Sequence, residues 1–347
     1  MSARSRGLGG RLAGGPRVAA VLLAPLWIAC GSSAPPARSA PECPPCEAGS
    51  ETPREQAPRA PASNAAACRE AGLAVQVLGS GGPILDDERA SSGYLVWVGG
   101  RARLMVDAGP GTMHRFGRTG ARIEDLDALL LTHFHVDHSA DVAGFLKTAS
   151  FGERSAPLPV RGPTGDGPFP DVDGFLAALL AEDGAYHYLG GFSGDGQPFA
   201  LAPEAVDAGH DATSEVFANE RLRVRAVGVP HGPVPALAYE VTVGDTRIAF
   251  MGDQRADTEA YAELVRGVDL LVAHMAIDGE TSGPAARLHA TPARLGEVAA
   301  EAEVGRMVLS HLMRRALDDL DANLEAIRSS YDGPLEVAED GTCLVLR

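Results

Sequence analysis

The chain has 347 residues, of which 45% are hydrophobic, and its formal net charge is −16. This hydrophobic content supports a folded core and excludes an intrinsically disordered chain, and the length fits one large domain or two small ones. The strongly acidic balance repels phosphate backbones, so we do not expect a nucleic-acid partner.

The first thirty residues have the pattern of a secretion signal. Four arginines precede an apolar run at 18–28, which is too short to span a bilayer comfortably. The run ends at Cys30, in a segment that resembles the box where bacterial lipoproteins are cleaved and lipidated. We therefore expect 1–30 to be a signal peptide and Cys30 to carry a lipid that anchors the protein to a membrane in the periplasm or at the outer membrane of a bacterium. Ordinary cleavage after a small residue is the alternative, and it also implies export.

The next segment, 31–70, consists largely of Pro, Ala, Ser and Glu, with almost no large apolar side chain. Such a segment cannot bury enough surface to fold, so we predict a disordered linker there and a catalytic domain at 71–347. The linker is either a tether that holds the domain off a membrane surface or a passive leftover.

The five cysteines fit an exported protein. If Cys30 carries lipid, four remain, and we predict the disulfide pairs Cys43 with Cys46 and Cys68 with Cys343. The second pair would join the start of the domain to its last strand. The Cys-Pro-Pro-Cys motif could also be a redox site or half of a zinc site, but it has no strand-helix context and no second half.

In chain order, the first half of the domain shows strand and helix patterns with a glycine-rich turn at 79–83. That turn is not followed by the Lys-Ser/Thr of a phosphate loop, so nucleotide binding is not indicated. We predict strands at 73–78, 94–98, 102–106, 126–131 and 157–161, helices at 138–150 and 171–182, and a loop-rich stretch up to 219.

The second half begins with a strand at 221–227 and a hairpin formed by 236–241 and 247–251. Strands around Leu270 and Met307 then alternate with helices at 291–302 and 317–329. Hairpins early in each half, followed by strands alternating with helices, predict an α/β protein in which two sheets pack together with helices outside.

The strongest motif is the cluster His133, His135, Asp137 and His138, which directly follows an apolar strand and begins a helix. Ligands gather at this position in sheets covered by helices. Three imidazoles and a carboxylate within six residues would be costly in a core, whereas they are the groups that zinc accepts as ligands. A polar loop that is rich in histidine by chance is the alternative.

One loop cannot encircle a metal, so further ligands must come from other strand ends. His231, Asp253 and His311 each follow a predicted strand. Taken singly, each would more often be a turn former or a surface histidine. Together with the cluster they indicate a metal site.

Several motifs now support a family resemblance, at 78–83, 106–112, 231–239, 252–253, 288–291 and 309–311, besides the histidine cluster. With these motifs the sequence resembles the metallo-β-lactamase superfamily of metal-dependent hydrolases. Within it, the chain is most similar to the branch that contains ribonuclease Z and the periplasmic arylsulfatase-like enzymes. The resemblance runs from about Leu78 to about Leu312.

The resemblance implies a four-layer αββα fold with two Zn²⁺ ions in a groove between the sheets. Carried over by position, one ion would be held by His133, His135 and His231, the other by Asp137, His138 and His311, with Asp253 bridging the two. A carboxylate bridge neutralises part of the charge of two metals, and a water between them would ionise near neutral pH and become the nucleophile.

Two further residues receive roles. Asp107 is expected to accept a hydrogen bond from a ligand imidazole, or else to be a turn residue before Gly109. His289 resembles the histidine that contacts the scissile group in this branch, and it would act as a general acid that protonates the leaving oxygen. Asp137 is the second residue expected to be catalytic. The alternative for His289 is an exposed neighbour of a helix cap. His274 is expected to be a buried structural histidine.

Ribonuclease Z proteins carry a long inserted arm between the third histidine motif and the Gly-Asp motif, whereas here only 22 residues lead from His231 to Asp253. We therefore expect hydrolysis of small sulfate or phosphate esters outside the cytoplasm. A ribonuclease Z-like phosphodiesterase or endoribonuclease is the first alternative. The second is a surface-anchored metal-binding module that has lost turnover.

Overall fold

The computed structural model describes residues 65–194 and 198–346. They fall within one compact unit, Pro58–Arg347. The predicted signal peptide, Cys30, and the predicted pair Cys43 and Cys46 lie outside the described residues. Within the described residues, no helix has both the length and the apolar character needed to cross a membrane.

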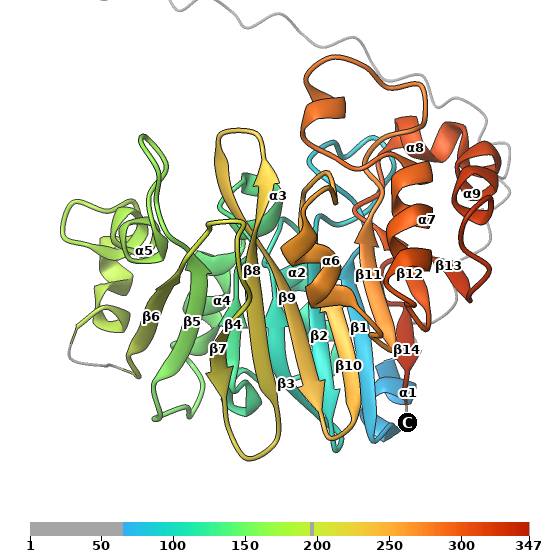
Figure 1. Cartoon of the computed structure of the whole chain (residues 1–347). Coiled ribbons are helices and arrows are strands. Elements are labelled where there is room, and N and C mark those ends of the chain that lie inside the picture. The colour runs from blue at the N-terminus through green and yellow to red at the C-terminus, as the bar shows by residue number, and fades with distance from the viewer. Residues whose placement is uncertain (1–64, 195–197, 347) are drawn as a thin grey trace, which may run out of the picture. The chain divides into compact units, whose positions relative to one another are not determined.

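The described part of the unit contains two seven-stranded sheets (Figure 1). In order across the first sheet, the strands are β14 (Cys343–Val345), β1 (Leu73–Gly79), β2 (Gly93–Val98), β3 (Arg101–Val106), β4 (Ala128–Leu130), β5 (Leu158–Pro163) and β6 (Leu201–Val206). In the second sheet they are β13 (Leu335–Val337), β12 (Met307–Ser310), β11 (Leu270–His274), β10 (Thr246–Phe250), β9 (Val234–Val243), β8 (Arg223–His231) and β7 (Ser214–Ala218).

Helices cover the outer face of each sheet (Figure 1). Those of the first half are α1 (Ala65–Glu70), α2 (Thr112–Thr119), η1 (Ile123–Asp125), α3 (Val136–Ser139), α4 (Val142–Ala149), α5 (Val172–Leu180) and η2 (His187–Phe192). Those of the second half are α6 (Glu259–Val265), η3 (Ala285–Arg287), α7 (Pro292–Glu301), α8 (Arg314–Asp318) and α9 (Leu320–Arg328). The predicted four-layer αββα arrangement is confirmed.

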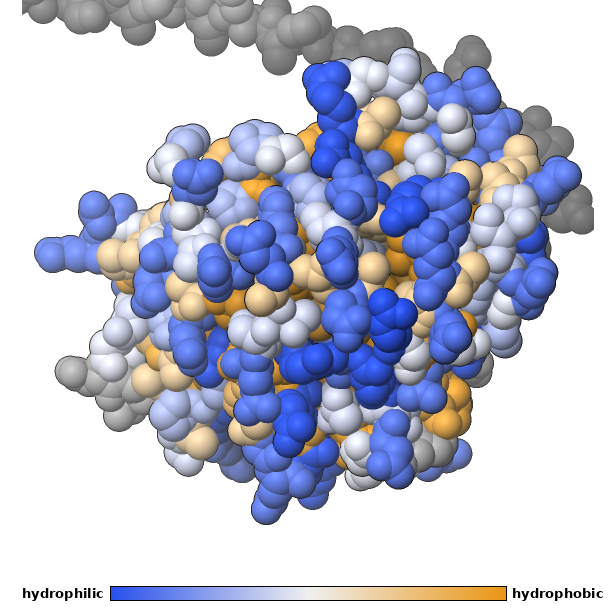
Figure 2. All heavy atoms as spheres, viewed as in Figure 1, coloured by the Kyte–Doolittle hydropathy of each residue, from blue (hydrophilic) through white to orange (hydrophobic). Residues whose placement is uncertain are grey.

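Along each strand, successive side chains enter different layers of the core. In β2, Tyr94 and Val96 belong to the core between the sheets, whereas Leu95 and Trp97 pack under the helices. Successive strand residues point to opposite faces, so a strand buried on both faces is apolar nearly throughout. On the face shown in Figure 2, hydrophilic residues predominate and hydrophobic residues appear only in small areas.

Each sheet begins with antiparallel hairpins and continues with parallel strands. Strands β3 to β6 of the first sheet are parallel, as are β10 to β13 of the second. Because parallel strands need crossovers, helices connect them, and their carboxyl ends collect at one edge. The residues that follow β4, β10 and β12 therefore meet at the same edge of the sandwich.

Three predicted boundaries were wrong. The stretch before 219 was predicted as loop but contains η2, β6 and β7, because the edge strands β6 and β7 are largely exposed and lack an apolar pattern. The predicted helix 138–150 is two helices, because Asp141 N donates to Ala108 O at 2.8 Å and so leaves the helical hydrogen-bond pattern. The predicted helix 317–329 likewise divides into α8 and α9.

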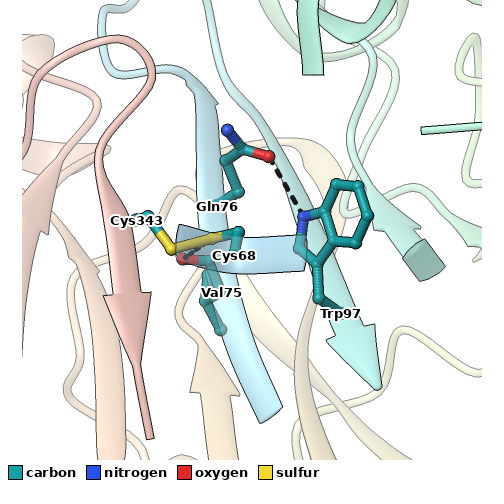
Figure 3. The surroundings of a disulfide bond; sticks show 5 residues. All are labelled: Cys68, Val75, Gln76, Trp97 and Cys343. Atoms are coloured by element: carbon teal, nitrogen blue, oxygen red, sulfur yellow. Dashed lines mark hydrogen bonds between the residues drawn. A yellow bond between two sulfur atoms is a disulfide. The ribbon is translucent and has the colours of Figure 1, made fainter. Parts of the chain in front are cut away.

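The segment assigned to the linker, 31–70, contains a helix at its end, α1. Cys68 of α1 is fully buried and forms a disulfide with Cys343 of β14, 275 residues away (Figure 3). Beside it, Trp97 Nε1 donates a hydrogen bond to Gln76 Oε1 at 3.1 Å. The covalent link gives this short helix the tertiary anchor that its composition does not predict.

Candidate metal centre

The histidine cluster follows β4 and is fixed by buried polar contacts from both sheets. The backbone N of Leu237, in β9, donates to Thr132 O at 2.9 Å. Asp107 accepts hydrogen bonds from Thr132 N at 2.7 Å and from the Thr132 hydroxyl. Its second oxygen lies 2.8 Å from His138 Nδ1. Asp107 is thus placed to fix the orientation of the His138 ring, the role expected of it.

The remaining residues of the site come from three other strand ends. His231 is the last residue of β8, at the tight turn formed by Gly232. Asp253 follows β10 through Gly252, whose φ is 64°. His311 follows β12 and itself has a φ of 52°. A side chain at φ > 0 is strained, and such strain occurs where a fold holds a functional group in place.

The glycine-rich turn of the sequence lies against His311. Gly82 N donates to Leu312 O at 3.2 Å, and Leu312 N donates to Ser80 O at 2.8 Å. A Cβ on Gly82 would stand 2.8 Å from His311 Cε1. The turn therefore needs glycine at this position because the His311 imidazole lies directly against its backbone.

Together these elements form two groups of side chains whose ligand atoms all lie within 4.8 Å of one another. The first group is His133, His135, His231 and Asp253, and the second is Asp137, His138, Asp253 and His311. All seven residues predicted as ligands are included. Asp253 is common to both groups, as a bridging carboxylate would be.

Short distances between ring nitrogens, and between ring nitrogens and carboxylate oxygens, define the geometry of the two groups. In the first group, His135 Nδ1 lies 3.0 Å from His133 Nε2 and 3.3 Å from His231 Nε2. In the second group, His311 Nε2 lies 3.2 Å from Asp137 Oδ2 and 3.3 Å from Asp253 Oδ1. Ring nitrogens and carboxylate oxygens thus converge on common points.

Two imidazoles of the first group, those of His133 and His135, have lowered pKa values, which favours their neutral form. Burial lowers the pKa of His133 well below its usual value, and the neighbouring rings of His138 and His231 lower it further. Burial, with the His231 ring, also lowers the pKa of His135. Neutral imidazole is the form that binds a metal.

The second group is electrostatically different because it contains two carboxylates, those of Asp137 and Asp253. Burial disfavours a charge on His138, yet the carboxylates of Asp253 and Asp107 hold its pKa well above the usual value. Burial likewise opposes the ionisation of Asp253, but His311 and His138 hold the pKa of that carboxyl well below its usual value. The carboxylates are therefore ionised and available as ligands.

The donor set fits metal ions. His138 Nε2 is buried and has no hydrogen-bond partner among the described residues, although Asp137 and Asp253 oxygens lie 3.5 and 3.6 Å away. Its other nitrogen is held by Asp107. A buried ring with one nitrogen fixed by a carboxylate and the other free is the arrangement of a metal-binding histidine, and nitrogen and carboxylate ligands suit zinc.

His289 lies at the rim of the same site. Its Nδ1 is 3.9 Å from Asp253 Oδ2, and its ring centroid is 5.4 Å from that of His231. Nδ1 is buried without a hydrogen-bond partner in the described part of the chain. Burial lowers the pKa of His289 to about 4, so the ring is neutral at neutral pH. The ring faces the site and is not an exposed neighbour of a helix cap.

His274 was expected to be only structural, but it contacts the site directly. Its Nδ1 lies 2.8 Å from Asp253 Oδ1, and its Nε2 lies 3.1 Å from the Tyr94 hydroxyl. It is the last residue of β11, paired in register with Ser310 of β12. The signal was in the sequence, since His274 ends an apolar strand just as the other site residues follow one.

The fold and the site together define a class of protein, a metal-dependent hydrolase with an αββα sandwich. Comparisons with known proteins agree. Residues 86–287 match the family model of the metallo-β-lactamase superfamily. The chain is 30% identical to a ribonuclease Z of Mycolicibacterium paratuberculosis over 284 residues, which is 77% of this chain and 96% of the relative.

Solved structures show the same fold. The metallo-β-lactamase fold protein YhfI of Bacillus subtilis has a TM-score of 0.60 at 20% identity, covering 78% of this chain and 98% of YhfI. The short form of human tRNase Z has a TM-score of 0.62 at 18% identity, covering 79% and 99%. The chain belongs to the metallo-β-lactamase superfamily, on the ribonuclease Z side of it.

Proposed function

We propose that this protein is a dinuclear zinc phosphodiesterase that acts on small esters. The observation that carries the proposal is the position of Asp253, whose carboxylate belongs to both groups of converging side chains. One carboxylate shared between two such groups suits two metal ions held about 3.5–4 Å apart. Ions at that spacing clamp the attacking and leaving oxygens of a phosphoryl group.

In this proposal His133, His135 and His231 hold one ion, Asp137, His138 and His311 hold the other, and Asp253 touches both. When bound, the ions would lower the pKa of a water and stabilise the anionic transition state. Asp137 then has a catalytic role through the position of its ion.

The chain's own residues orient this chemistry. Asp107 holds the His138 ring through Nδ1, so that Nε2 is directed into the site. In this proposal His289 contacts the leaving oxygen. Since its pKa is about 4, the neutral ring at neutral pH assists by a hydrogen bond from its N–H, and full proton donation is confined to acidic pH.

A second candidate, cleavage of structured RNA, is favoured by the relatives named ribonuclease Z. Against it stands the hairpin between the site's third and fourth segments. Strand β9 ends at Val243 and β10 begins at Thr246, so a tight turn joins them and no arm extends there. The acidic net charge of −16 also disfavours a polyanionic substrate. Small phosphodiesters are therefore the first choice.

Metal analysis and a substrate panel test the proposal. We expect about two zinc ions per chain, and turnover of bis(p-nitrophenyl) phosphate that a chelator abolishes and zinc restores. If only an aryl sulfate is turned over, the substrate is a sulfate ester and not a phosphate ester. Cleavage of a transfer RNA precursor at a higher kcat/KM would support the second candidate. Absence of bound metal after zinc loading would reject the hydrolase mechanism.

For the segment before the described residues, we propose export as a lipoprotein anchored through Cys30. The support is the order of four arginines, an apolar run and a cysteine at the N-terminus. Expression in a bacterial host with labelled palmitate should label the wild-type chain in the membrane fraction. The variant Cys30→Ser should lose the label. Retention of wild-type protein in the cytoplasm would contradict the proposal.

A further inference from the structure

A surface pocket of about 450 Å³ lies next to the metal centre, and its charge is unusual for this protein. It is lined by two arginines, Arg255 and Arg287, together with three prolines and Leu288. None of the described residues that line it carries a carboxylate. In a chain with a net charge of −16, a pocket with two guanidinium groups and no acid indicates selection for a negatively charged ligand.

Residues that line the pocket are neighbours of residues of the metal centre. Leu288 directly precedes His289, and its carbonyl oxygen lies 3.1 Å from His231 Nδ1. Arg255 is two residues beyond Asp253. The pocket therefore lies beside the site, where a part of the substrate that is not cleaved can occupy it.

The two arginines differ in how they are held. Arg255 Nη2 lies 2.7 Å from Asp257 Oδ2, and 44% of the Arg255 side chain remains exposed. Within the described residues the Arg287 side chain has no ion pair or hydrogen bond, and it is exposed at the end of η3. Arg255 is thus positioned and Arg287 is free to contact a ligand. The planar fork of guanidinium suits phosphate, sulfate and carboxylate groups.

The backbone that carries Arg255 is held in a strained conformation. Ala256 has a φ of 57° and is buried, and its carbonyl oxygen accepts a hydrogen bond from Arg294 Nε at 2.9 Å. A residue with a Cβ adopts this conformation only when its surroundings enforce it. The segment that carries Asp253 therefore also fixes the backbone position from which the Arg255 side chain extends.

We propose that Arg255 and Arg287 form an anion-binding subsite for a second negatively charged group of the substrate, one that is not hydrolysed. The proline and leucine side chains contact the apolar part that connects this group to the scissile ester. This inference rests on the proposed function, because the substrate is placed by its phosphoryl group at the metals. It narrows the substrate class to esters that carry a second phosphate, sulfate or carboxylate.

Binding of non-hydrolysable phosphonates tests the subsite without turnover. Zinc-loaded protein is titrated calorimetrically with methylphosphonate and with alkane-α,ω-diphosphonates whose two groups are separated by two to four methylenes. We expect at least one diphosphonate to bind about tenfold more tightly than methylphosphonate, the gain given by a charge-assisted hydrogen bond. Arg287→Gln and Arg255→Gln should each remove most of that gain and leave methylphosphonate binding unchanged.

Arg118→Gln is the matched control, because Arg118 is an exposed arginine outside the pocket. It should leave both affinities at the wild-type value. If diphosphonates gain nothing over methylphosphonate, or if the gain survives both pocket variants, the subsite is overturned while the proposed function stands. If no phosphonate binds at all, phosphoryl binding at the metals fails, and the subsite falls with the proposed function.

Discussion

His274 Nδ1 lies 2.8 Å from Asp253 Oδ1, so a buried histidine at the end of β11 holds the carboxylate that both metal groups share. The other ring nitrogen of His274, Nε2, lies 3.1 Å from the Tyr94 hydroxyl, which in turn donates to Ser310 Oγ at 2.9 Å. Burial lowers the pKa of His274 to about 4, so the ring is neutral and donates from a single nitrogen. A chain of polar side chains within the core thus fixes the position of Asp253.

The first prediction concerns this contact. His274→Ala should weaken zinc binding about 10- to 100-fold, because removal of a group that orients a ligand typically has this effect. His274→Asn should recover much of the affinity, since its amide can donate to Asp253 from nearly the same place as Nδ1. Competition with a chromogenic chelator measures the affinity. His114→Ala, at an exposed site, is the control, and equal affinities for all variants would refute the role.

The second prediction concerns metal and stability. The buried imidazoles and carboxylates of the site converge only in the folded protein, so zinc should bind the folded state in preference to the unfolded state. Zinc should therefore raise the thermal midpoint of the protein, by an amount that grows with zinc concentration. At about 100 times the dissociation constant the gain is about 2.7 kcal/mol. Asp253→Ala should lose most of this gain because both groups lose a ligand. Scanning calorimetry with zinc and with chelator gives the comparison, and a zinc response in Asp253→Ala equal to wild type would contradict the shared role.

The third prediction is a pH dependence that arises from Glu240, a residue outside the candidate metal centre. Glu240 of β9 has a side chain that is 1% exposed, and it accepts hydrogen bonds from Arg247 Nη2 at 2.8 Å and from Arg225 Nε at 3.0 Å. Burial opposes the charge, but the hydrogen bonds from these arginines and from Thr242 outweigh it and lower the pKa of Glu240. Glu240→Gln should therefore destabilise the chain by about 2 kcal/mol at pH 7.

The sign of the pH effect follows from the lowered pKa. The stabilisation is fully present above the unfolded pKa of about 4.3 and is lost as the pH falls through the lower pKa of the folded state. The difference between wild type and Glu240→Gln in urea unfolding, measured with chelator, should hence shrink as the pH falls below about 4.3. A difference that stays constant over this range would show that the charge is not responsible. Glu215→Gln, in an exposed ion pair with Arg223, should change stability little.

The fourth prediction concerns the disulfide. Cys68 and Cys343 close a loop of 275 residues, and a link of this kind typically contributes about 2–4 kcal/mol. A reductant should lower the thermal midpoint of the wild type. The double variant Cys68→Ser, Cys343→Ser should start at the lower midpoint and show no response to reductant. Thiol titration shows whether the wild type has been reduced. If it has been reduced and its thermal midpoint is unchanged, the packing of α1 alone is enough to hold this helix in place.

The sequence by itself determined the metal centre and the fold family. Each ligand candidate follows an apolar strand, and the carboxyl ends of parallel strands meet at one edge, so these residues are expected to gather there. The family resemblance then assigned them to the two metal sites. The cluster at His133 also has a spacing that few other roles require. Asp107 could be assigned for the same reason, since it follows β3, the neighbour of β4.

Only the tertiary structure decided the contacts that depend on neighbours distant in the chain. The partner of His274 is set by the register between β11, β12 and the facing β2, and no local pattern encodes that register. The exposed strands β6 and β7 have no apolar period, so pairing with β5 and β8 alone defines them. Arg255 and Arg287 are likewise ordinary surface residues in the sequence. They line one pocket because the segments after β10 and β11, which are neighbouring parallel strands of the second sheet, leave that sheet at the same edge.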